Sequence, residues 1–162
     1  MVYIRLVTDD DWPAVWRVLE PVFRAGETYP CSIDISEADA RRYWVEVPTA
    51  TFVAVDGGGE IVGTYYIRPN QPGLGDHVCN CGYIVAEGAR GQGVGSALCE
   101  HSLQEALARG FRAMQFNLVV ATNEASYELW RKYGFTAIGT LPQAFRHAQL
   151  GPVDAYVMYK LL

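Results

Sequence analysis

The residues of this chain whose spacing points most directly to chemistry are the glycines of Arg90–Gly95, which reads Arg-Gly-Gln-Gly-Val-Gly. An apolar segment, Cys81–Ala86, precedes them, and an apolar helical period follows from Val94 to Leu107. A glycine turn that opens a helix leaves backbone N–H groups unpaired beside the positive end of the helix dipole. The stretch therefore predicts an anion site, for which pyrophosphate is the best-suited ligand.

Two common phosphate-binding turns do not fit this stretch. A Walker A loop requires a lysine, and none lies near the turn. A dinucleotide-binding turn requires a third glycine where Ser96 stands, and an acid closing the next strand, yet Met114–Ala121 contains no acid. The pattern that remains is Arg-Gly-x-Gly-x-Gly.

A second motif follows at residues 123–135, Asn-Glu-Ala-Ser-Tyr-Glu-Leu-Trp-Arg-Lys-Tyr-Gly-Phe. Together the two motifs resemble the acetyl-CoA loop and the pantetheine-flanking helix of the GCN5-related N-acetyltransferase (GNAT) superfamily. The resemblance implies acetyl-CoA as co-substrate. It also implies contacts to that molecule from Ile84, Val85, Arg90, Gly91, Gln92, Gly93, Val94, Gly95, Ser96, Asn123, Ser126 and Trp130.

The same resemblance implies direct attack of an amine on the thioester within a ternary complex. A backbone N–H around Tyr83–Val85 would then stabilise the oxyanion, so Tyr83 is a predicted catalytic position. Where much of the family has a proton-donating tyrosine, this chain has Trp130, whose indole is not a usable acid. Tyr127 and Tyr133 flank it, and either could substitute or simply pack.

No carboxylate lies on the strand that precedes the turn, but Asn80 stands within it and Asn117 within the next strand. Amides are unusual at strand centres. We expect both to be catalytic and to face the gap where amine and acetyl group meet; alternatively, they only satisfy each other in the sheet. The pattern around His77–Tyr83 also resembles the branch that acetylates proline-like imino acids such as azetidine-2-carboxylate.

Acceptor contacts are expected from loops, because polar and aromatic groups on loops are suited to gripping a substrate. The loop Ala25–Ile35 carries Glu27 and Tyr29, and His77 precedes the apolar strand. A second loop, Pro142–Pro152, carries Phe145. Each of these residues could equally belong to an ordinary solvated loop.

The elements that position these residues follow the order β-α-α-β-β-β-α-β-α-β-β, which matches the GNAT pattern over nearly the whole chain. Residues 1–162 are therefore expected to form a single α/β domain. We expect a mixed, mostly antiparallel sheet of about seven strands with helices on both faces. Pro21 should kink the first helix, Trp12–Arg24, or end it early.

Composition sets further bounds. Half of the 162 residues are hydrophobic and the net charge is −5, with no basic stripe for a nucleic acid. No apolar run approaches the ~20 residues that cross a bilayer, and no signal peptide is recognisable, which favours the cytoplasm. The four cysteines lack zinc spacing, so no metal is expected. A homodimer is compatible with the sequence.

The predicted function is therefore acetyl-CoA-dependent N-acetylation of a small amine, amino acid or imino acid. One alternative is acetylation of a protein N-terminus or lysine. Another is a non-catalytic domain that binds acyl-CoA as a sensor, because the usual tyrosine is missing. The sequence does not identify the acceptor.

Overall fold

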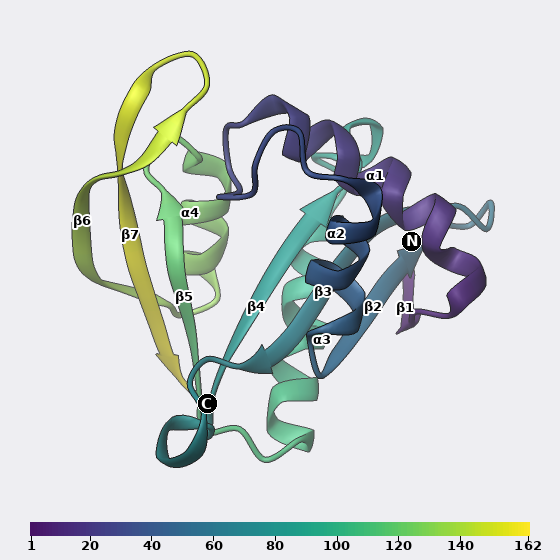
Figure 1. Cartoon of the computed structure of the whole chain (residues 1–162). Helices are drawn as coiled ribbons and strands as arrows, with labels where there is room; N and C mark the ends of the chain where they lie inside the picture. The colour runs from purple at the N-terminus through teal and green to yellow at the C-terminus, as the bar shows by residue number, and fades with distance from the viewer.

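The computed structural model describes the whole chain, residues 1–162, and is built on one seven-stranded sheet in the order β1-β2-β3-β4-β5-β7-β6. All neighbouring strands are antiparallel except β4 and β5, as predicted for a GNAT fold. Helices cover both faces (Figure 1). The elements are β1 Tyr3–Leu6, α1 Trp12–Ala25, α2 Glu37–Arg41, β2 Ala50–Val55, β3 Ile61–Pro69, β4 Val78–Val85, α3 Val94–Ala108, β5 Ala113–Val120, α4 Glu124–Lys132, β6 Thr136–His147 and β7 Gly151–Leu161. None of the helices has the length and apolar character needed to cross a membrane.

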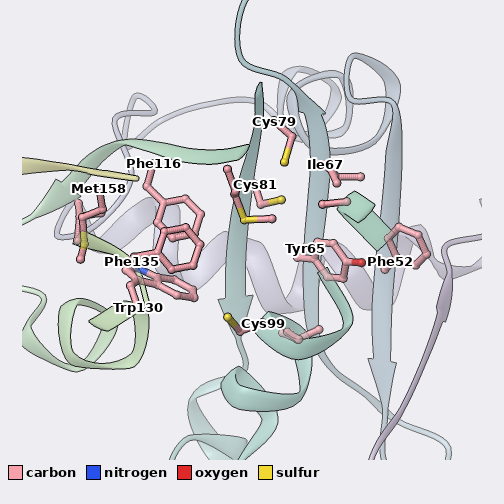
Figure 2. Packing of buried hydrophobic residues seen from close by; sticks show 14 of the residues in the cluster. Phe52, Tyr65, Ile67, Cys79, Cys81, Cys99, Phe116, Trp130, Phe135 and Met158 are labelled. Carbon is pink, nitrogen blue, oxygen red and sulfur yellow. The ribbon is translucent and has the colours of Figure 1, made fainter. Parts of the chain in front are cut away.

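Each face of the sheet has its own core. Under α3 and α4, the rings of Phe116, Trp130 and Phe135 pack together, and Tyr65 stacks on Phe52 (Figure 2). Under α1 and α2, the core is built around Trp44, which is fully buried. Strand residues alternate between the two cores, because successive side chains of a strand point to opposite faces.

The centre of the sheet is incompletely paired. β4 and β5 share only the pairs Val78↔Ala113 and Cys79↔Met114, and beyond these the strands diverge (Figure 1). β4 continues to Val85 with β3 as its only strand partner. A central strand therefore has one free edge inside the molecule.

The first helix corrects one expectation. α1 continues through Pro21 to Ala25 and ends at Gly26, whose φ of 64° is left-handed. The predicted early end is therefore wrong. Val15, Leu19 and Phe23 are buried on its inner face, and such packing outweighs the hydrogen bond that a proline removes.

The C-terminal hairpin, β6–β7, differs from a second expectation. The segment Pro142–Pro152 was expected to be a loop, but β6 runs to His147 and β7 begins at Gly151. β6 is an edge strand, where a proline is tolerated. Its register shifts between Leu141 and Phe145, with Gln143 at a φ of 52°.

Candidate active site

The glycine turn joins the C-terminal end of β4 to α3. Gly91 and Gly93 have φ values of 74° and 84°, a left-handed region that favours glycine. A Cβ built on either would meet no protein atom within 4 Å. The space beside these two glycines is therefore open for a ligand to approach the backbone.

This turn also leaves a run of donors free. The backbone N–H groups of residues 91–96 donate to no protein carbonyl. The first main-chain hydrogen bond of α3 runs from Ala97 N to Gly93 O. Gln92 Nε2 donates to Gly88 O at 2.9 Å, which ties the turn together. Arg90 is exposed and forms no ion pair within the chain. Free N–H groups, a helix N-terminus and an arginine fit the pyrophosphate of acetyl-CoA.

A cleft of about 1170 Å³ leads away from this turn to the diverging strands. Of the predicted acetyl-CoA contacts, its lining includes Ile84, Val85, Arg90, Gly91, Gly95, Asn123, Ser126 and Trp130. Gln92, Gly93 and Val94 line a second hollow of about 620 Å³, and Ser96 lines neither. We call the turn side of the cleft the donor end, and the side around Asn80 and Tyr29 the acceptor end.

Trp130 and Tyr83 belong to the wall between the donor end and the core. Their ring centroids lie 4.7 Å apart, and Tyr83 Oη lies 2.7 Å from Ser102 Oγ. Burial holds the pKa of Tyr83 well above its usual range, so its phenol stays protonated. The role of a backbone N–H near Tyr83 as oxyanion donor remains a prediction.

Asn80 lies at the acceptor end and is only 7% exposed. Its Nδ2 donates to Gln115 O at 2.9 Å, while its Oδ1 is held only by Tyr66 Oη at 3.5 Å. A Cβ at Gly82 would lie 2.6 Å from Tyr66 Cε1, so the glycine lets that ring lie across β4. The amide oxygen of Asn80 thus retains capacity to accept a hydrogen bond from a ligand.

Asn117 also lines the cleft, but it is exposed. Its Nδ2 donates to Asn70 Oδ1 at 2.7 Å, and its Oδ1 accepts from Gln115 Nε2 at 3.0 Å. Asn80 and Asn117 therefore do not satisfy each other, and that alternative is wrong. Both amides face the same cleft.

Of the four residues expected to contact the acceptor, two line the cleft and two do not. Glu27 and Tyr29 line the cleft, and Tyr29 Oη donates to Tyr83 O at 2.9 Å. His77 precedes β4 and is exposed at the strand end opposite the glycine turn, outside the cleft. Phe145 is buried on β6, paired with Val153, and it also lies outside the cleft.

The cleft residues that were not anticipated include Tyr43, Tyr66 and Arg68. Tyr66 lies in a β-branched and aromatic strand, which is typical of core positions. The prolines and glycines of residues 69–75 predict a loop over Arg68–Asp76, but β3 extends to Pro69. The signal available was the alternation of Tyr66 with Arg68, which places both on one face of a strand.

Comparison with known proteins identifies the fold's relatives. The model of the acetyltransferase (GNAT) family matches residues 12–135, which include both motifs. N-acetyltransferase aca1 of Schizosaccharomyces pombe is 32% identical over 148 residues, covering 82% of this chain and 71% of the relative.

Comparison with solved structures gives the same family relationship. A GCN5-related N-acetyltransferase from Kribbella flavida is 41% identical, with a TM-score of 0.94 over 99% of this chain and 98% of that one. A phosphinothricin acetyltransferase from Sinorhizobium meliloti in complex with AcCoA shares the fold at 22% identity, with a TM-score of 0.88 over 99% of this chain and 88% of that one. This chain therefore belongs to the acetyltransferase (GNAT) family and is an N-acetyltransferase that uses acetyl-CoA.

Proposed function

We propose that the chain acetylates a small molecule, an amine, amino acid or imino acid, by direct attack of its amine in a ternary complex. The observation that carries this proposal is a bridge at the acceptor end. Ala148 N, in the β6–β7 turn, donates to Gly26 O, in the α1–α2 loop, at 3.0 Å.

The bridge joins the two segments that border this end of the cleft. Glu27 and Tyr29 line it from the α1–α2 loop, and His147 and Leu150 from the other side. A Cβ at Gly26 would lie 3.0 Å from Ala148 Cβ, so the backbones approach closely. A polypeptide could not run between these segments without breaking the bridge. A compact acceptor requires no such opening.

The donor end supports the other half of the proposal. The free N–H groups of residues 91–96 would bind the pyrophosphate of acetyl-CoA. The free edge of β4 beyond Cys79 would pair with the amides of the pantetheine arm, in the manner of an added strand. Bound there, acetyl-CoA supplies the thioester whose acetyl group passes to the amine.

The state of the cysteines favours direct attack of the acceptor amine on the thioester over an acyl-cysteine intermediate. Burial raises the pKa of the Cys99 thiol to about 12 and that of Cys31 to about 11, so neither is a thiolate near neutral pH. Cys79 and Cys81 are buried in the core under α3. Because burial does not activate the thiols of Cys99 and Cys31, the proposed nucleophile is the amine of the acceptor.

The tyrosines at the acceptor end do not supply a general base. Burial raises the pKa of Tyr29, Tyr43 and Tyr66, so these phenols stay protonated. Asn80 Oδ1 would accept a hydrogen bond from the amine and orient it, while water carries its proton away. Trp130 forms a wall for the thioester arm and supplies no proton.

Imino acids are one class of small acceptor that should be tested. The segment His77–Tyr83 together with Asn117 resembles the azetidine-2-carboxylate acetyltransferase branch. Asn80 and Asn117 line one cleft, which supports that narrower resemblance.

The test is release of free CoA thiol from acetyl-CoA with a panel of acceptors. The panel contains simple amines, amino acids, imino acids, peptides with a free N-terminus and lysine peptides. We expect turnover with small acceptors and none with peptides. Turnover confined to peptides would overturn the proposal, and acetyl-CoA binding without release for any acceptor would indicate a sensor.

A further inference from the structure

The cationic side chain of Arg68 lies at the acceptor end and forms no ion pair or hydrogen bond with another side chain. Arg68 is on β3 directly opposite Asn80 of β4, so both side chains are on the same face of the sheet. Its guanidinium carbon lies 5.2 Å from the ring centroid of Tyr66 and 5.9 Å from that of Tyr43. Both rings are within cation–π distance of the guanidinium and help to hold it in place.

No acid neutralises this guanidinium. The five ion pairs of the chain involve Arg5, Arg24, Arg41 and Arg109, and Arg68 makes no side-chain hydrogen bond to the protein. The carboxylates that line the cleft, Glu27 and Glu87, come from the α1–α2 loop and from the turn after β4. The N–H donors of Arg68 therefore remain free to bind a ligand.

Arg68 is too far along the strand to belong to the pyrophosphate turn. Its partner Asn80 precedes the end of β4 at Val85 by roughly 16 Å, at about 3.3 Å per residue. The turn has its own cation in Arg90. The cleft thus offers separate anion sites at its two ends.

We infer that Arg68 binds a carboxylate of the acceptor and selects amino or imino acids over simple amines. This inference rests on the proposed function. A guanidinium pairs with a carboxylate through two parallel hydrogen bonds. Residues paired across two strands have Cβ atoms about 5 Å apart, so Arg68 and Asn80 could hold the carboxylate and the amine of one compact molecule.

The test compares acceptors that differ only in their carboxylate, such as azetidine-2-carboxylate with azetidine, and proline with pyrrolidine. For the unaltered protein we expect kcat/KM to be about 10- to 100-fold higher for the acid of each pair, as expected for a charged hydrogen bond. Equal values within each pair would overturn the inference and leave the proposed function standing. Release of CoA with peptides alone would instead refute the proposed function.

Variants separate Arg68 from other causes of such a preference. Arg68→Met keeps an apolar stem over the rings, and it should raise KM for the acids about 10- to 100-fold while leaving KM for the simple amines unchanged. Arg68→Lys should recover part of the lost preference. Arg42→Gln removes an exposed positive charge outside the cleft and should change neither value.

Two results with Arg68→Met would contradict the assignment. One is a carboxylate preference that persists in the variant. The other is weaker binding of acetyl-CoA, measured by calorimetry, which would place Arg68 at the donor instead. A thermal melt establishes that each variant is folded, and the paired acceptors test the unaltered protein even if a variant is not.

Discussion

The two ends of the cleft are built in different ways. The donor end takes its hydrogen-bond donors from consecutive backbone groups, residues 91–96, held by two left-handed glycines. The acceptor end takes its groups from side chains on β3, β4 and the α1–α2 region, such as Arg68, Asn80 and Tyr29. A single local conformation thus forms one end, whereas strand register and tertiary packing form the other.

This difference predicts unequal sensitivity to substitution. A side chain that obstructs the turn removes access to several donors at once. A truncation at the acceptor end removes one group and leaves its neighbours in place. We therefore expect loss of acetyl-CoA binding from one residue at the donor end, and changes in acceptor kinetics from single residues at the other.

The largest effect is expected at Gly93. In Gly93→Val, a branched side chain would occupy the open space through which the ligand approaches the backbone, so acetyl-CoA binding should fall below detection by calorimetry. Gly110→Val is the matched control, because Gly110 has a φ of 85° against 84° and also meets nothing within 4 Å. Both variants carry the same backbone strain, and only Gly93→Val should lose binding. Equal affinity in the two would remove the turn from the acetyl-CoA site.

The next effect concerns the two asparagines. Asn80→Ala should raise the acceptor KM about 10- to 100-fold, because it removes the amide oxygen that would hold the amine. Asn117→Ala should mainly lower kcat, by about 10-fold, if its amide orients the water that takes the proton. Steady-state kinetics beside a thermal melt measure both, and acetyl-CoA affinity should change little.

Asn70→Ala sharpens this comparison. Asn70 holds Asn117 through a 2.7 Å hydrogen bond and is outside the cleft. Its truncation should reproduce part of the Asn117 effect on kcat and leave the acceptor KM unchanged. Earlier melting with normal kinetics in all three variants would show that the amides serve only the sheet.

A smaller effect is expected in the pH profile. Because Tyr29, Tyr43 and Tyr66 have raised pKa values, none becomes a base near neutral pH. The acceptor kcat/KM should rise with pH as the amine loses its proton, and level off above the amine's own pKa. An acceptor whose amine pKa is about one unit lower should shift the rise by about one unit. A rise at the same pH for both acceptors would reveal a base on the enzyme.

The smallest effect is expected at Trp130. Trp130→Phe keeps a ring against Tyr83 and Phe116, so activity should stay within about threefold while the melting temperature falls. Trp130→Tyr should add no acidic limb to the pH–rate profile. A loss of several orders of magnitude in Trp130→Phe, with acetyl-CoA binding intact, would assign the indole a chemical role.

The sequence predicted the sheet and the glycine turn before α3 well because their signals are local. Glycine spacing determines the turn, and alternating apolar residues determine the strands. Asn80 and Asn117 were selected as candidates because amides are unusual in strands, and both line the cleft. Their partners, Gln115 O and Asn70, could not be predicted, since they depend on how β4 and β5 diverge.

The incorrect expectations at the acceptor end also concern features that depend on how strands are arranged in the folded protein. Arg68 was placed in a loop because prolines follow it, although Pro69 is tolerated as the last residue of β3. His77 is next to β4 in sequence, but it lies at the strand end away from the turn. The approach of Tyr66 to Asn80 requires the space left by Gly82, which only the register of β3 and β4 reveals.

The outer strands have a consequence for self-association. A sheet edge can act as a template for a further strand, which is a common route to aggregation. One edge here is β1, only four residues long. The other is β6, where Pro142 has no N–H and the bulge at Gln143 interrupts the ladder. Neither edge offers a long regular template, and this disfavours the joining of two copies of this chain through one continuous sheet.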